Sequence, residues 1–105
     1  MPGFERISAA QAKEKMALAD PVFIDIRDES SYLASHINMA QHIDNHSLPD
    51  FIANADKTAP LIVCCYHGHS SLSAAQFFLE QNFEEVYSLD GGFEGWQQAF
   101  PDLCT

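Results

Sequence analysis

Two adjacent cysteines, Cys64 and Cys65, precede a short polar loop in the second half of the chain. The apolar run 61–64 is typical of a buried strand, and the amphipathic pattern over 71–81 predicts a helix after the loop. A cysteine at this junction would lie at the carboxyl edge of a strand, where open α/β sheets place their ligands. Loop N–H groups and the positive end of the helix favour a thiolate there. The pattern therefore indicates a nucleophilic cysteine in an anion-binding loop.

The two cysteines are expected to differ, because successive side chains of a strand point to opposite faces of the sheet. Cys64 is predicted to be a small hydrophobic core residue. Cys65 abuts the loop, where Gly68 permits backbone conformations that let successive N–H groups point inward at an anion. Ser70 or Ser71 is expected to cap the helix. A buried structural thiol is the alternative interpretation of Cys65.

Two other uses of such a loop can be tested on the sequence. A cysteine phosphatase clamps phosphate with an arginine at the position of Ser71, and no Lys or Arg occurs from Thr58 onward. A metal site from the two cysteines with His67 and His69 lacks the usual C-x₂-C spacing. We therefore expect no phosphatase activity, no metal and no cofactor. A Cys–His–Asn arrangement for acyl transfer stays open, because its geometry cannot be read from one sequence.

The histidines could add charge to the loop. If protonated, His67 and His69 would supply the positive charge that the missing arginine does not, and simple exposure of both is the alternative. His42 and His46 lie in a polar connecting segment and are expected to be solvated.

Composition and charge restrict the class of protein. A chain of 105 residues with 47% hydrophobic content predicts one folded domain over 1–105. Its formal charge of −10 argues against nucleic acid and acidic membrane surfaces as partners. The apolar runs are too short to span a membrane, the N-terminus does not resemble a secretory signal, and three cysteines make no disulfide framework. We therefore expect a cytoplasmic protein.

Strand-like and helix-like segments alternate along the whole chain. Strands are predicted at 4–7, 22–26, 41–43, 61–64 and 86–89. Helices are predicted from a capping box of Ser8 and Gln11 to about Ala19, and at 28–35, 48–55, 71–81 and 93–100. This alternation predicts an α/β fold, a parallel sheet with helices on both faces.

Three segments together resemble the rhodanese family, specifically its compact single-domain thiosulfate sulfurtransferases of the GlpE type. The first spans 22–43 and contains Asp25-x-Arg27 followed by Tyr32-x₃-His36-Ile37-x₂-Ala40-x₂-Ile43, with Asn38-Met39 where the family usually has Pro-Gly. The second is the loop Cys65-Tyr66-His67-Gly68-His69-Ser70-Ser71, which has serines where many rhodaneses carry a basic residue. The third spans 86–96 and matches the C-terminal signature except at Leu89 and Gly95.

The resemblance implies a five-stranded sheet and a ping-pong sulfur transfer. The Cys65 thiolate would take the sulfane sulfur of thiosulfate, release sulfite and pass the persulfide sulfur to cyanide, a dithiol or a thioredoxin-like protein. The loop expected to bind the substrate consists of Tyr66, His67, Gly68, His69, Ser70 and Ser71. The alternative is a sulfur-carrier module that receives sulfur from a protein partner and turns over little thiosulfate, which the absence of basic residues around the loop favours.

The other matched residues are expected to be structural. Asp25 and Arg27 would form an internal ion pair rather than contact substrate. Phe93 and Trp96 are predicted to be core residues, with a place in the pocket wall as the alternative. Gly91-Gly92 would allow a tight turn that approaches the active loop closely. Near the C-terminus, Cys104 is expected to be exposed and without a role, with a resolving thiol as the alternative.

Overall fold

The sheet has the parallel α/β architecture that the sequence predicts. A computed structural model describes residues 3–105, so residues 1–2 of the predicted domain lie outside the described residues. One sheet contains five strands in the order β1-β5-β4-β2-β3, and every neighbouring pair is parallel. The strands are β1 (Glu5–Ile7), β2 (Val22–Asp25), β3 (Gln41–His42), β4 (Leu61–Cys64) and β5 (Val86–Leu89).

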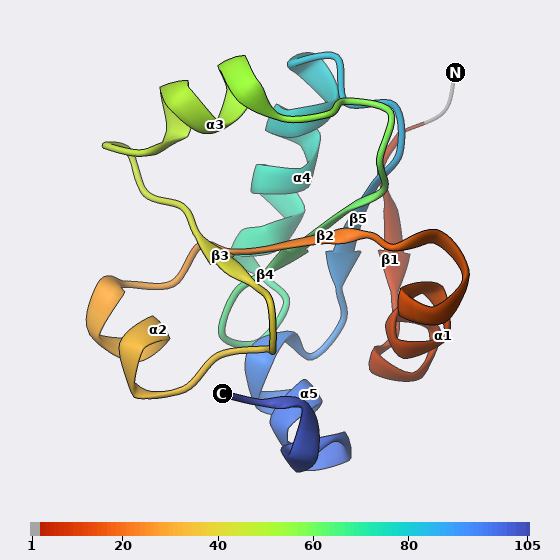
Figure 1. The fold of residues 1–105 in the computed structure, drawn as a ribbon, viewed down its shortest axis with the longest axis vertical. Coiled ribbons are helices and arrows are strands. Elements are labelled where there is room, and N and C mark those ends of the chain that lie inside the picture. Colours follow the sequence, from red (N-terminus) through yellow and green to blue (C-terminus); the bar gives the residue numbers. More distant parts are fainter. Residues whose placement is uncertain (1–2) are drawn as a thin grey trace.

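Helices cover both faces of this sheet (Figure 1). They are α1 (Ala9–Ala19), α2 (Glu29–Ala34), α3 (Leu48–Asn54), α4 (Ser70–Glu80) and α5 (Gly92–Ala99), followed by a 3₁₀ turn (Pro101–Leu103). Apolar side chains of α1 and α5 pack on one face around Phe23 and Trp96. On the other face, α3 and α4 pack around Val63 and Phe78. The predicted segments are therefore confirmed, with their ends moved by a residue or two.

The start of α1 follows the local sequence, whereas the start of α4 does not. At α1 the capping box is confirmed, because Gln11 N–H donates to Ser8 Oγ over 3.1 Å and Ser8 N–H donates to Gln11 Oε1 over 3.0 Å. At α4 the N-cap is His69, and no side chain caps the helix there. The prediction that Ser70 or Ser71 caps α4 is wrong, because Ser71 lies inside the first turn and turns its hydroxyl toward Cys65.

The turn before β3 places Met39 where the family usually has a glycine. Met39 adopts a φ of +72°, in the left-handed region that favours glycine. Ala40 N–H donates to Ile37 C=O over 2.9 Å and closes the turn. The side chain of Met39 is 87% exposed, so the unusual backbone creates no clash in the core.

The C-terminus is tied to the segment before β3. An isolated antiparallel bridge joins Ile37 and Cys104, and Thr105 N–H donates to His36 C=O over 2.8 Å. Cys104 is half-buried, and its Sγ donates to Phe100 C=O over 3.7 Å. The prediction that Cys104 is exposed is therefore wrong, because this bridge folds the tail back onto the domain.

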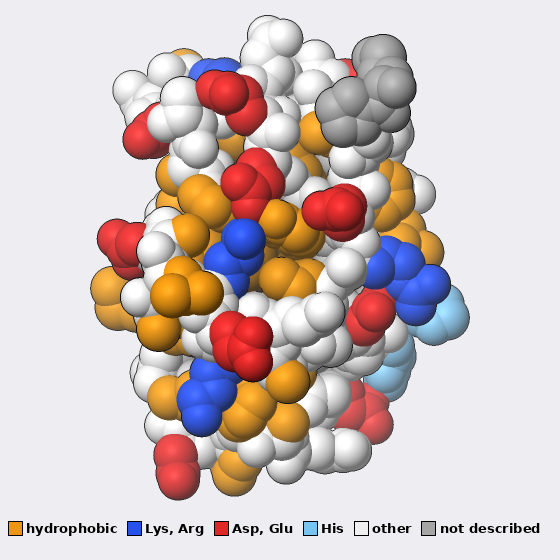
Figure 2. Space-filling model, turned by 90° about the vertical axis from the view of Figure 1, so that its right-hand side faces the viewer, with side chains coloured by type: hydrophobic (Ala, Val, Ile, Leu, Met, Phe, Trp, Pro, Cys, Tyr) orange, Lys and Arg blue, Asp and Glu red, His pale blue; other side chains and the backbone are white. Residues whose placement is uncertain are grey.

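The few basic side chains are distributed among acids and aromatic rings. Figure 2 shows basic groups next to acidic ones on the side that carries α1. The pairs are Arg6 with Asp90 at 2.7 Å, Lys15 with Glu85 at 3.0 Å, Lys13 over the Phe100 ring at 4.8 Å and Lys57 over the Phe83 ring at 5.5 Å. The fifth basic residue, Arg27, is buried. Positive potential at the β4–α4 loop must therefore come from histidines or from backbone dipoles.

Candidate active site

Cys65 directly follows the central strand β4, and its sulfur is surrounded by hydrogen-bond donors. Its Sγ accepts the N–H of Gly68 over 3.1 Å and the N–H of Ser71 over 3.3 Å. The Ser71 hydroxyl lies 3.3 Å from the same sulfur. Gly68 has a φ of +92°, a conformation that glycine permits, and this turns the loop so that its N–H faces inward.

Two opposing effects set the acidity of this thiol. Burial disfavours a charged sulfur and by itself raises the pKa of Cys65. The Ser71 hydroxyl and the N–H groups of Ser71, Gly68 and His67 stabilise the thiolate, and together they outweigh burial, so the pKa of Cys65 is lowered. The thiolate, the form in which a cysteine acts as a nucleophile, is therefore favoured at Cys65 although the residue is only 3% exposed.

Cys64 lies on the opposite side of the strand, as alternation predicts. It belongs to the apolar cluster formed with Phe23, Ile62 and Trp96. Its Sγ donates to the Cys65 carbonyl over 3.5 Å. Burial first, and then the negative charge of Asp25, raise the pKa of the Cys64 thiol well above its usual value. The predicted role of Cys64 as a core residue is confirmed.

The first turn of α5 holds the β4–α4 loop through its backbone carbonyls. Phe93 N–H donates to the Cys65 carbonyl over 2.7 Å, and Glu94 N–H donates to the Tyr66 carbonyl over 3.2 Å. A Cβ at Gly92 would lie 2.5 Å from both carbonyl oxygens, so only glycine allows this approach. The predicted close contact of the Gly91-Gly92 turn with the active loop is confirmed. Because α5 binds these carbonyls, the N–H groups of the loop are left to face the sulfur.

A second helix holds the outer side of the loop. The hydroxyl of Tyr66 donates to Asp28 and lies 2.6 Å from the Ser31 hydroxyl. Asp28 is also the N-cap of α2 and accepts the Ser31 N–H over 3.1 Å. Tyr66 is half-exposed at the edge of the site. Three connections, β2–α2, β4–α4 and β5–α5, therefore meet around Cys65.

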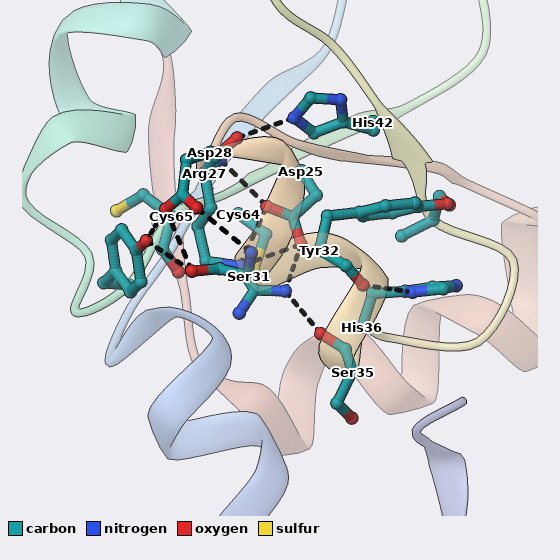
Figure 3. A network of polar contacts seen from close by, with 12 residues as sticks. Asp25, Arg27, Asp28, Ser31, Tyr32, Ser35, His36, His42, Cys64 and Cys65 are labelled. Carbon is teal, nitrogen blue, oxygen red and sulfur yellow. Dashed lines mark hydrogen bonds and ion pairs between the residues drawn. The ribbon is translucent and has the colours of Figure 1, made fainter.

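The ion pair expected at the end of β2 forms behind the loop (Figure 3). Arg27 Nη2 lies 2.7 Å from Asp25 Oδ2 and also donates to Ser35 C=O over 2.6 Å. The guanidinium lies 4.1 Å above the centre of the Phe93 ring. Phe93 and Trp96 are both buried, which confirms them as core residues. Because Asp25 neutralises Arg27, this cation leaves little net positive charge for the site.

The histidines differ in solvent exposure and in their polar partners. His67 Nδ1 pairs with Glu94 Oε2 at 2.9 Å on the exposed side of the loop, and His69 is exposed at the start of α4. His46 is exposed, as predicted. His42 is half-buried and its Nε2 lies 2.7 Å from the Arg27 carbonyl, so the prediction that it is solvated is wrong (Figure 3). The tertiary contact of β3 with the end of β2 brings this ring inside.

The sequence model of the rhodanese-like domain family matches residues 8–99 of the chain. The chain belongs to the rhodanese family. It is 56% identical over 101 residues to the protein named thiosulfate sulfurtransferase GlpE from Stutzerimonas stutzeri, covering 96% of this chain and 92% of that protein. It is 54% identical over 98 residues to the protein of the same name from Pseudomonas paraeruginosa, covering 93% of this chain and 88% of that one.

Solved structures agree on the fold. A rhodanese-like domain protein from Staphylococcus aureus superposes with a TM-score of 0.75 at 21% identity, covering 89% of this chain and 91% of that one. A rhodanese-related protein from Thermoplasma volcanium gives a TM-score of 0.77 at 21% identity, covering 91% of this chain and 93% of that one. At these identities the likeness concerns the architecture, in which this rhodanese places Cys65 after its central strand.

One residue of this rhodanese site escaped the sequence analysis. Ser88 of β5 is buried, and its Oγ lies 2.7 Å from the Ser71 Oγ. A serine within an apolar strand was the available signal, because a buried hydroxyl needs a partner. The sequence could not name that partner, since the two serines are 17 residues apart and meet only when α4 packs on β5.

Among residues 3–105, no group of three or more His, Cys, Asp or Glu side chains could hold a metal ion. Within the same part of the chain, no helix is both long and apolar enough to cross a membrane.

Proposed function

We propose that this rhodanese is a thiosulfate sulfurtransferase with Cys65 as its nucleophile. The observation that carries the proposal is the sulfur of Cys65, held by two backbone N–H groups and one hydroxyl that favour its thiolate form. The names of the relatives with more than half of their residues in common support the same activity.

The reaction divides into two displacements at sulfur. The Cys65 thiolate attacks the sulfane sulfur of thiosulfate, the new S–S bond forms, and the bond to the sulfonate sulfur breaks with its electron pair leaving as sulfite. The enzyme then holds the sulfur as a Cys65 persulfide. A thiophilic acceptor attacks the outer sulfur and releases the thiolate, which closes a ping-pong cycle. Cyanide or a thiol, either small or on a thioredoxin-like protein, would serve as the acceptor.

The substrate is a dianion, whereas the chain carries a formal charge of −10. We assign its binding to the loop residues Tyr66, His67, Gly68, His69, Ser70 and Ser71. The first N–H groups of a helix have no carbonyl partner one turn earlier, and in α4 the Ser71 N–H donates to the Cys65 sulfur, where the anion would be bound. Salt screens the distant acidic groups beyond roughly 8 Å, so these short-range dipoles dominate at the site.

The identity of the residue at position 71 favours sulfur over phosphate. A phosphatase of related architecture requires an arginine that grips the phosphate with two hydrogen bonds. Ser71 is instead fully buried, and its hydroxyl lies 3.3 Å from the Cys65 sulfur. The chain therefore offers a small anion backbone donors, without the arginine clamp of phosphoryl transfer.

A sulfur carrier is the second candidate, and one observation favours it. The Arg27 guanidinium close to the site is neutralised by Asp25, and the loop itself has no Lys or Arg. Capture of free thiosulfate would then be weak, and a protein donor could deliver sulfur directly. Steady-state turnover of thiosulfate distinguishes the two, because a carrier would accept sulfur from a donor persulfide while turning over thiosulfate only slowly.

The deciding experiment weighs the intact protein after incubation with thiosulfate. We expect a gain of one sulfur atom that is lost on adding cyanide and is missing in Cys65→Ser. Cys64→Ala is the matched control and should gain the sulfur as the wild type does. Wild-type protein that stays unmodified by thiosulfate would disprove the proposal. Because the cycle needs a free thiol at Cys65, we also propose a reducing compartment, the cytoplasm, as the site of action.

A further inference from the structure

Ser88 occupies a place in β5 where an apolar side chain would be expected. It lies in the row of β5 side chains that faces α4, next to Val86, which belongs to the apolar cluster on that face. The residue is 0% exposed, and its hydroxyl oxygen lies 2.7 Å from that of Ser71. A buried hydroxyl costs free energy that an alanine or valine would avoid, so its bond to Ser71 needs an explanation.

The charge of Cys65 decides which way the hydrogen bonds between Cys65, Ser71 and Ser88 point. Each serine hydroxyl has one hydrogen to donate and can also accept. When Cys65 is a thiolate, its sulfur can only accept, so Ser71 must turn its hydrogen toward Sγ across 3.3 Å. The Ser71 oxygen is then free to accept, and the Ser88 hydroxyl at 2.7 Å is the donor that can fill it.

We propose that Ser88 is a positioning residue that orients and polarises the Ser71 hydroxyl as a donor to the Cys65 thiolate. When Cys65 loses its proton to water, Ser88 donates to Ser71 and Ser71 donates to the sulfur. Donors linked in a chain strengthen one another, by roughly 10–30% per bond. Ser88 therefore stabilises the charged form of Cys65 without touching it, and its effect reaches the sulfur through Ser71 alone.

A simpler role predicts a different outcome. If Ser88 only ties β5 to α4, its removal lowers the stability of the protein and leaves the ionisation of Cys65 unchanged. The inference rests on the proposed role of Cys65 as nucleophile. Its test uses alkylation of the thiolate and not sulfur transfer, so its outcome is independent of whether thiosulfate is the substrate.

The test measures the rate of iodoacetamide alkylation of Cys65 against pH, quantified at this residue by peptide mass mapping. Below the thiol pKa the rate is proportional to the thiolate fraction. We expect Ser88→Ala to slow alkylation about two- to fivefold at neutral pH and to move the profile to higher pH. Ser71→Ala, which removes the direct donor, should slow it about tenfold. Ser88→Thr keeps a hydroxyl and should restore the wild-type profile, and Ser73→Ala, at an exposed serine of the same helix, should also match it.

The double variant Ser71→Ala/Ser88→Ala isolates the route. We expect Ser88→Ala to add nothing once Ser71 has lost its hydroxyl. An equal shift from Ser88→Ala in both backgrounds would overturn the proposal, as would a profile unchanged by Ser88→Ala in a protein with a lower melting temperature. If Ser88→Ala does not fold, Ser88→Cys replaces it, because a thiol of similar size is a weaker donor and should give a shift of the same sign.

Discussion

Cys64 and Cys65 are neighbours of the same type and almost equal burial, yet the structure gives them opposite chemistry. Burial raises the pKa of the Cys64 thiol well above its usual value, whereas the sulfur of Cys65 itself is less deeply buried and the donors around it outweigh the cost of burial and lower its pKa. The difference lies in what each sulfur faces. Cys64 packs among apolar side chains, and Cys65 meets two N–H groups and a hydroxyl. The hydrogen-bond donors around its sulfur are therefore what lowers the pKa of Cys65, although the residue has almost no exposed surface.

The largest expected effect on stability and activity comes from displacing the loop after β4, whose donors give Cys65 a lower pKa than Cys64. In Gly92→Ala the new Cβ would lie 2.5 Å from the Cys65 and Tyr66 carbonyl oxygens, at a φ of +58°. We expect a loss of stability of about 3 kcal/mol or more and loss of most sulfur-transfer activity, because the displaced loop misdirects its N–H groups. Urea unfolding and turnover assays measure the two effects.

Gly95→Ala is the matched control for this change. It lies in the same helix, and an added Cβ there would have its nearest contact at 3.9 Å. This variant should keep its activity and gain up to about 1 kcal/mol of stability from the better helix former. Equal damage from both substitutions would show that α5 responds to any added methyl group and not to its contact with the loop.

The second prediction compares the two thiols directly as a function of pH. Cys65 should be alkylated with a midpoint below that of an unperturbed cysteine, about 8.5, and Cys64 should resist alkylation in the folded protein. Mapping of the alkylated peptides in native protein and in denaturant checks this. In denaturant the rates should become similar, and a difference that persists there would place its cause in the local sequence.

The lowered pKa of Cys65 also has a consequence for stability. Its folded-state pKa lies below the unfolded value, so ionisation stabilises the fold at pH values above the unfolded thiol pKa. This contribution is lost as the pH falls through the folded-state pKa of Cys65. Removing the thiol in Cys65→Ser should therefore flatten the rise in stability at alkaline pH, as measured by urea unfolding at several pH values.

A smaller effect is expected from Gly68→Ala. The added Cβ would lie 3.0 Å from Gly91 N and 3.1 Å from Leu89 C=O, at a φ of +92°. The N–H that donates to Cys65 Sγ should move, and we expect turnover to fall about tenfold and the pKa of Cys65 to rise. Assays of turnover against pH test both. An unchanged profile would show that the Gly68 N–H does not contribute to the lowered pKa of Cys65.

The smallest effect on activity is expected from Cys64→Ala. Its sulfur faces the core, so turnover should stay within about twofold of the wild type. Loss of the buried sulfur should lower the stability by about 1–2 kcal/mol, as measured by urea unfolding. A folded Cys64→Ala protein with turnover as low as that of Cys65→Ser would contradict the assignment of Cys64 to the core and of the nucleophile to Cys65 alone.

Much of this site follows from the sequence because its causes are local. Strand alternation separated Cys64 from Cys65, the glycine at position 68 indicated a loop whose N–H groups can turn inward, and the Ser8 and Gln11 pair predicted the start of α1. These predictions needed only a few consecutive residues. The same reasoning was wrong for the N-cap of α4, because the contact of Ser71 with Cys65 competes with capping and only the folded loop decides between them.

The amino-acid sequence by itself determined the alternating α/β fold, the position of Cys65 at the end of a strand and the serine, not arginine, at position 71. The tertiary structure alone decided which groups meet at the sulfur and around it. The strand order places β5 beside β4, so Ser88 reaches Ser71 and α5 reaches the loop carbonyls, and the same packing brings His42 to the Arg27 carbonyl. Such contacts join distant parts of the chain, and their formation depends on the packing of whole elements, which no short segment encodes.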